Sequence, residues 1–313
     1  MKVEIYFRNW QNQTEKISSM KAFKINKILV PIDLSANSML ALEHATFMAK
    51  LFKADIILAH VMETKVAKLD LGTFTASDKK YAEQIINEKL DTLATELRIK
   101  IGGKVTYLIK AGKIAKGVAD ATAESKADII IMGTHGVSGF EEFFMGSNAF
   151  RVVTEAKVPV ITVQTHASKV GFDNILCPID SSDPSREKVR YVLELAKKYN
   201  SKVHILGILS VDDDDAALLL DKKLEQVEKY FAKHEINYTM EMVEGENLAS
   251  ITMKQAKKHK SDLIVIMTEQ EENFTGILMG PYAQQVVNHS KIPVMSITPD
   301  PTGFADNKLS AGS

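Results

Sequence analysis

Glycines and small polar residues between Gly133 and Asn148 are spaced in a way that suits phosphate chemistry. The spacing Gly-x2-Gly-x9-Gly-Ser is formed by Gly133, Gly136, Gly146 and Ser147. An apolar run, Asp128–Met132, predicts a buried strand before this stretch, and a helix is predicted at Gly146–Ala156. Glycine lets a backbone approach a ligand closely, and the N–H groups of such a loop and of a helix N-terminus attract anions. The stretch is therefore expected to bind phosphate.

A carboxylate at Asp33 is the second candidate for binding chemistry. Asp33 directly follows the apolar run Ile28–Ile32, which predicts another short strand. Ligands of open parallel sheets bind beyond the carboxyl ends of the strands, so Asp33 could accept a hydrogen bond from an adenine amino group or a ribose hydroxyl. Near the phosphate loop, Ser147 and Asn148 either donate to a ligand or cap the helix.

The chain contains an internal repeat. The motif Ile-Leu-x-Pro-Ile-Asp occurs twice, and Asp180 matches Asp33 at an offset of 147 residues. Farther along, "KADIIIMGTHG" near Asp128 matches "KSDLIVIMTEQ" near Asp262 at an offset of 134. The smaller offset means that the second copy is shorter in its middle. A repeat of this length indicates two homologous domains.

Short apolar runs alternate with helical patterns in both copies. The expected strands of the first copy are Ile28–Ile32, Asp55–Val61, Val105–Ile109, Asp128–Met132 and Pro159–Val163. Those of the second are Ile175–Ile179, Lys202–Leu209, Asn237–Val243, Leu263–Met267 and Val294–Ile297. Such alternation predicts the α/β class, with a parallel sheet covered by helices on both faces. We expect an extension at 1–25, domains at 26–165 and 171–299, and a tail at 300–313.

The motif, together with "ILVPIDLS" at the first strand and "ILAHVM" at the second, resembles the universal stress protein family in its tandem two-domain form. The resemblance implies two open five-stranded parallel sheets of strand order 3-2-1-4-5. It also implies that ATP binds the first domain, with Asp33 and Val61 at the adenosine, and that a divalent ion such as Mg²⁺ can bridge the phosphates. The expected site comprises Pro31, Ile32, Asp33, Val61, Gly112, Met132, Gly133, Gly136, Gly146, Ser147 and Asn148.

The second copy departs from the motif. At the positions of Gly133, Gly136, Ser147 and Asn148 it has Met267, Gln270, Pro281 and Tyr282, and only Gly280 keeps the place of Gly146. Proline removes an N–H donor, and the larger side chains fill the space that a phosphate needs. We therefore expect the second domain to bind ATP weakly or not at all, and Asp180 to be structural.

Composition limits the function classes. The chain has 313 residues, a formal net charge of −1 and one cysteine, Cys177, so it lacks the strong positive field of a nucleic-acid-binding protein. It contains no apolar run of about 18 residues that would span a membrane, and we expect a cytoplasmic protein. We find no metal-ligand cluster, zinc helix or hydrolase elbow. Cys177 lies in an apolar run and is interpreted as a buried hydrophobe.

Three functions stay open at this point. The first is an ATP-binding regulatory stress protein with little turnover, acting on an unknown protein partner. The second is an enzyme, either a slow ATPase or an adenylating enzyme, although no catalytic residue can be named. The third is an interaction scaffold that binds no nucleotide. The family usually pairs domains through the fifth strand, so Pro159–Val163 would lie beside Val294–Ile297, and dimerisation of the whole chain stays open.

Overall fold

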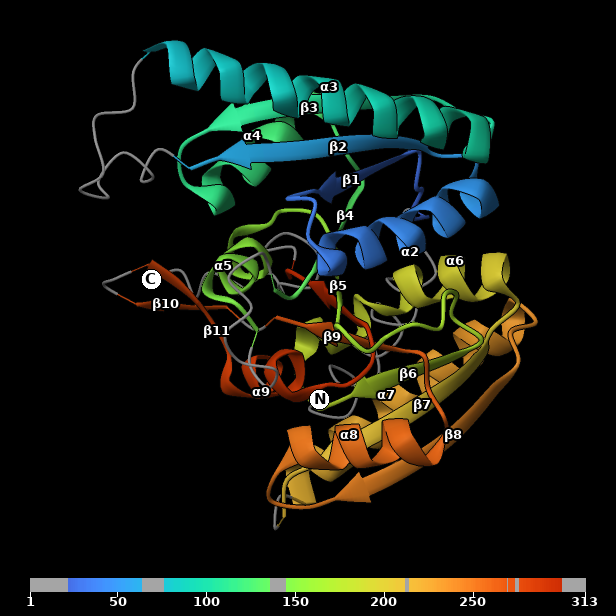
Figure 1. Cartoon of the computed structure of the whole chain (residues 1–313). Helices are drawn as coiled ribbons and strands as arrows, with labels where there is room; N and C mark the ends of the chain where they lie inside the picture. The colour runs from blue at the N-terminus through green and yellow to red at the C-terminus, as the bar shows by residue number, and fades with distance from the viewer. Residues whose placement is uncertain are drawn as a thin grey trace, which may run out of the picture. The chain divides into compact units, whose positions relative to one another are not determined.

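The computed structural model describes residues 22–63, 76–135, 145–211, 214–268, 270–273 and 276–299 (Figure 1). The chain divides into two compact units. The N-terminal unit contains Ile25–Gly171, and the C-terminal unit contains Phe172–Val286 and the last strand. Each unit is described by itself. Of the extension expected at 1–25, only residues 22–25 are described.

The N-terminal unit is built on a five-stranded parallel sheet. Its strands are β1 (Lys27–Pro31), β2 (Asp55–Met62), β3 (Val105–Ala111), β4 (Ile129–Gly133) and β5 (Val160–Val163). They lie in the order β3-β2-β1-β4-β5. The central strands are buried along most of their length, as expected for apolar strands covered on both faces. The predicted strand order of the first domain is confirmed.

Four helices connect these strands. They are α2 (Ala36–Phe52), α3 (Ala76–Ile101), α4 (Ile114–Ser125) and α5 (Ser147–Glu155). Because crossovers between parallel strands are right-handed, α2 and α3 cover one face of the sheet, and α4 and α5 cover the other. Ser35 caps α2, since its hydroxyl accepts a hydrogen bond from the Ser38 N–H at 3.2 Å.

The C-terminal unit repeats this plan. Its parallel strands are β6 (Asn174–Ile179), β7 (Lys202–Leu209), β8 (Tyr238–Glu244), β9 (Leu263–Met267) and β12 (Val294–Ile297). They lie in the order β12-β9-β6-β7-β8, which is the same topology as in the first unit. The helices are α6 (Val189–Tyr199), α7 (Asp214–Lys233), α8 (Leu248–Lys258) and α9 (Pro281–His289).

Two features of the C-terminal unit differ from the sequence expectation. The first turn after β6 is a 3-10 helix, η2 (Asp183–Arg186), with a proline at its start, so that the α-helix begins only at Val189. The segment expected to align with the phosphate loop contains an antiparallel hairpin of β10 (Gln270–Asn273) and β11 (Gly276–Met279). The second copy therefore has two short strands here in addition to the five that its sequence predicts.

Two statements from composition can be compared with the structure. Cys177 lies in the core with a fully buried side chain, which confirms its interpretation as a small hydrophobe. Burial raises the pKa of its thiol to about 11, so the reactive thiolate is disfavoured. In the described part of the chain, every helix is too short or too polar to cross a bilayer.

Candidate functional site

A cavity of about 430 Å³ lies at the carboxyl ends of β1, β2 and β4 in the N-terminal unit. In this sheet β1 lies between β2 and β4. The chain therefore adds β2 and β3 on one side of β1, and then β4 and β5 on the other side. Such a switch point opens a crevice between neighbouring loops. The volume lies within the range of small-molecule sites.

The cavity brings together most of the predicted site residues. Those that line it are Pro31, Ile32, Asp33, Val61, Met132, Gly133, Gly146, Ser147 and Asn148. Gly112 lines an adjoining cavity instead. Gly136 lies outside the described residues, as does the rest of the loop from 136 to 144. The part of the motif that can be placed is therefore gathered at one site.

Asp33 is held in a tight turn at the start of α2. Its Oδ1 atom accepts hydrogen bonds from the Ser35 N–H at 3.0 Å and from the Ser35 hydroxyl at 2.6 Å. Leu34, between them, has a φ of 65°. Asp180 makes the same carboxylate contact in the C-terminal unit, where its Oδ1 accepts from the Ser182 N–H at 2.7 Å, although Ser181 lacks the positive φ of Leu34. Because both units share this contact, it is part of the fold, and Asp33 needs its surroundings to become a ligand-binding group.

Gly133 is required by packing against α2. A Cβ atom at this position would lie 2.9 Å from the backbone oxygen of Asn37 and 3.0 Å from its carbonyl carbon. The Asn37 side chain also donates to the backbone oxygen of His135 at 3.1 Å, which ties the start of the loop to the helix. The glycine was expected to make room for a phosphate, and the structure adds a second reason for it.

Gly146 places the N-terminus of α5 at the cavity. Its N–H donates to the Thr134 carbonyl at 2.9 Å, and a Cβ atom here would lie 3.2 Å from that same oxygen. Gly146 is the N-cap residue, and no side chain among the described residues caps the helix. Neither Ser147 nor Asn148 is therefore the cap, and both are exposed at the first turn. Uncapped first-turn N–H groups favour an anion.

Two histidines also line the cavity. The Nδ1 atom of His60 lies 2.8 Å from the Ile32 carbonyl oxygen, so this ring is held beside the end of β1. The Nδ1 atom of His135 lies 2.9 Å from the hydroxyl of its neighbour Thr134. Sequence reasoning did not select Ser38, Ala59, Glu63, Ile114, Val118, Thr134 and Ala149 for the cavity wall. Most of them lie at strand ends or in first helical turns, which was the available signal, whereas Ala59 and Val118 lie inside β2 and α4.

The equivalent place in the C-terminal unit keeps the backbone connection and loses the binding groups. The Gly280 N–H donates to the Thr268 carbonyl at 3.1 Å, which repeats the bond of Gly146 to Thr134. Met267, at the place of Gly133, is buried. Pro281 begins α9 and has no N–H to offer. The retained Gly280 thus makes the same backbone contact as Gly146.

A metal site is not formed by the residues that the structure describes, because they contain no cluster of three or more histidine, cysteine, aspartate or glutamate side chains suited to an ion.

The two units are tandem open parallel α/β folds, and one of them has a cavity at its switch point. This class is matched by the model of the universal stress protein family, which covers residues 24–164 and 171–297. The chain belongs to that family, as the motif indicated.

Relatives match one unit or both. A universal stress protein of Methanocaldococcus jannaschii is 30% identical over 152 residues, which cover 44% of this chain and 94% of the relative. A universal stress protein of Mycolicibacterium smegmatis is 23% identical over 294 residues, which cover 87% of this chain and 97% of the relative. The crystal structure of a universal stress protein from Archaeoglobus fulgidus superimposes with a TM-score of 0.73 at 22% identity, covering 88% of this chain and 99% of that one. This last likeness supports the fold.

Proposed function

We propose that this protein binds ATP in its N-terminal unit and acts as a regulatory stress protein with little turnover. The observation that carries the proposal is the cavity of about 430 Å³ that connects the end of β1 to the uncapped N-terminus of α5. One end of the cavity holds apolar side chains and the carboxylate of Asp33, and the other end presents backbone N–H groups beside Glu63. A nucleotide has the same division into a base and an anionic chain.

The residues present fit such a ligand. Ile32, Val61 and Met132 supply apolar surface for an adenine ring, and Asp33 supplies an acceptor for an amino group or a ribose hydroxyl. The first turn of α5, with Ser147 and Asn148, supplies donors for phosphate oxygens. Mg²⁺ would join with the phosphates and neutralise part of their charge.

We favour regulation over catalysis because, of the described titratable residues in the cavity wall, both histidines and Asp33 are already engaged in hydrogen bonds within the chain. His135 is hydrogen-bonded to Thr134, and Asp33 lies at the nucleoside end. A bound nucleotide could instead shift the chain between two conformations, provided that it binds one of them more tightly.

The C-terminal unit is proposed to bind no nucleotide. Pro281 removes one donor, and the side chain of Tyr282 is engaged by the hydroxyl of Thr252 at 3.1 Å. Because Ser147 and Pro281 occupy matching positions, substitutions at each of them test nucleotide binding in the two units separately.

Isothermal titration calorimetry of the full chain with ATP tests the proposal. We expect one site per chain. Ser147→Asp should weaken binding at least tenfold because its carboxylate faces the phosphates, yet it should not weaken folding because a negative charge suits a helix N-terminus. Ser147→Ala controls for the lost hydroxyl, and Pro281→Asp should leave binding unchanged. Native protein that binds no ATP, or binding lost only in Pro281→Asp, would contradict the proposal.

A further inference from the structure

A second cavity, of about 480 Å³, adjoins the first in the N-terminal unit. The two share Glu63, Ile114, Ser147 and Asn148 in their walls. The second cavity extends from the first turn of α5 to the first turn of α4, where Gly112 lies. A ligand that passes Ser147 in the first cavity would therefore enter the second.

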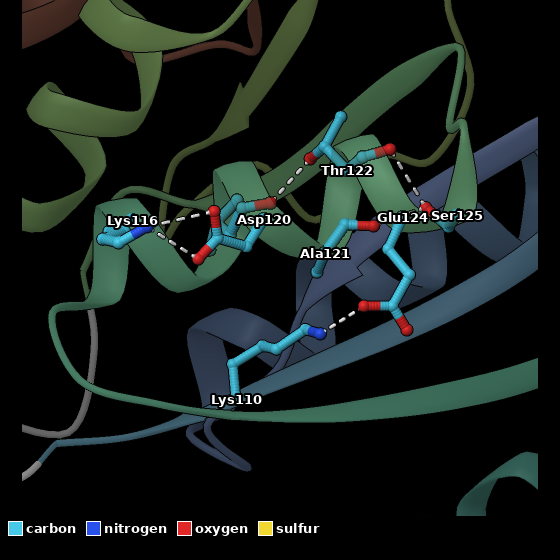
Figure 2. A network of polar contacts seen from close by, with 8 residues as sticks. Lys110, Lys116, Asp120, Ala121, Thr122, Glu124 and Ser125 are labelled. Carbon is cyan, nitrogen blue, oxygen red and sulfur yellow. Dashed lines mark hydrogen bonds and ion pairs between the residues drawn. The ribbon is translucent and has the colours of Figure 1, made fainter.

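Three cationic side chains line this second cavity: Lys113, Lys116 and Arg151. Lys116 is paired with Asp120 at 3.0 Å (Figure 2), so part of its charge is already balanced. Lys113 and Arg151 form no ion pair with any other residue that the structure describes. Glu63 and Glu155 also line the cavity and limit the excess of positive charge. Lys113 and Arg151 are thus the groups available to an anion.

The N-terminus of α4 is open as well. Its N-cap residue is Lys113, and no side-chain hydrogen bond caps the helix. A lysine side chain cannot accept a hydrogen bond, so the first-turn N–H groups of α4 need water or a ligand. Two uncapped helix N-termini, of α4 and of α5, therefore border one continuous space with two cations.

The C-terminal unit supplies an internal comparison. Gly112 and Gly245 occupy equivalent places. The Gly112 N–H donates to the carbonyl oxygen of Met62, the last residue of β2, and the Gly245 N–H donates to that of Leu209, the last residue of β7, both at 3.0 Å. One turn later, Gly117 donates to Lys113 at 2.9 Å and Ile251 donates to Asn247 at 3.0 Å. The C-terminal unit has one more residue, Glu246, between Gly245 and its helix, so Asn247 is the N-cap equivalent of Lys113.

In the C-terminal unit, the N-terminus of the equivalent helix, α8, is capped by Asn247. The Asn247 side chain accepts from the Ser250 N–H at 2.8 Å and caps α8. Along the same alignment, Lys116 corresponds to Ser250 and Arg151 to Gln285. The unit that has lost the phosphate motif thus has neutral residues at all three places and a capped helix. The unit that keeps the motif has cations and an open helix.

We infer that the second cavity binds the terminal phosphates of a nucleoside triphosphate, so that Lys113 and Arg151 make the site prefer ATP to AMP. This inference rests on the proposed function. AMP would occupy the first cavity alone, whereas the longer anionic chain of ATP reaches past Ser147 to both cations and to the N-terminus of α4. Lys116 and its partner Asp120 fix the edge of this subsite.

The test compares the dissociation constants of ATP, ADP and AMP on the full chain. The variant is Lys113→Asn with Arg151→Gln, which installs the residues of the C-terminal unit. Asparagine is a favourable N-cap, so the melting temperature should not fall. ATP affinity should drop about tenfold while AMP affinity changes less than twofold. The control, Lys100→Gln with Lys104→Gln, removes the same charge from exposed sites outside both cavities and should change neither.

The outcomes separate the two proposals. If the variant loses equal affinity for ATP and AMP, or keeps its affinity for ATP, the terminal-phosphate subsite is refuted while nucleotide binding stands. If the native chain binds none of the three nucleotides, the proposed function fails and the subsite fails with it. A loss of the preference for ATP over AMP in the variant alone supports the subsite.

Discussion

Replacement of Gly133 by alanine tests how much of the glycine pattern is required by packing. The added Cβ would lie 2.9 Å from the Asn37 backbone oxygen and 3.0 Å from both the carbonyl carbon and the Cγ atom of that residue. Non-bonded carbon atoms normally stay about 3.5–4.0 Å apart. The overlap therefore amounts to about 0.5 Å or more, and two of the three atoms belong to the backbone of the first turn of α2.

Relief of this overlap requires α2 to move away from β4, since backbone atoms cannot rotate aside. Overpacking of this kind costs about 1–3 kcal/mol, and we expect about 2 kcal/mol for Gly133→Ala. A loss of stability of this size corresponds to about a 30-fold rise in the population of the unfolded, exchange-competent state. Native-state hydrogen exchange of buried amides in β1 and β4 measures this population in the N-terminal unit itself.

Gly103→Ala is the matched control, because a Cβ atom there would meet the Ile101 side chain at 3.4 Å and no closer atom. Gly103→Ala should change the hydrogen-exchange protection of the amides in β1 and β4 by less than a factor of about three. A cost below about 0.5 kcal/mol for Gly133→Ala would refute the reasoning, since it would mean that the contact with Asn37 relaxes freely and that the glycine is not needed for packing.

Three further predictions concern other parts of the chain. Gly117→Ala should destabilise the N-terminal unit by about 1–2 kcal/mol in urea unfolding, because the new Cβ would lie 2.7 Å from a methyl group of the stiff side chain of Val61; an unchanged midpoint would contradict this. Burial, followed by the neighbouring His259, lowers the pKa of His204 from 6.5 to about 4. The unfolded chain therefore binds this proton first, and stability should fall as the pH drops from 6.5 toward 4; His204→Gln should flatten that slope in thermal melts, and parallel slopes would refute the assignment. Cys177, with a pKa of about 11, should resist iodoacetamide at pH 8 in the folded protein and react fully in denaturant.

The fold could be predicted from the sequence because its strands are short apolar runs in a regular alternation with amphipathic helices. The spans expected for β7, Lys202–Leu209, and for β9, Leu263–Met267, agree with the structure at both ends. The hairpin of β10 and β11 was missed because its sequence was aligned with the first copy at a constant offset, as if it were the same loop. The delayed start of α6 follows from Pro184, whose effect on the helix entry was not anticipated.

The site could be predicted in part for a geometric reason. Residues at the carboxyl ends of neighbouring parallel strands meet at one edge of the sheet, so Asp33, Val61 and Gly146 gather although they are distant in sequence. The contact of Gly133 with Asn37 could not be predicted, because it depends on how closely α2 approaches β4. It likewise could not be predicted that Lys113 and Arg151 line one cavity, because this depends on the placement of α4 beside α5.

The most direct test of the central claim is hydrogen exchange of the full chain with and without saturating ATP. The account predicts slower exchange at the β1–α2 turn around Asp33 and in the first turns of α4 and α5. It predicts no change around Asp180 or in the first turn of α9. Protection in the C-terminal unit, or no protection anywhere at saturating ATP, would contradict the assignment of the nucleotide to the N-terminal unit.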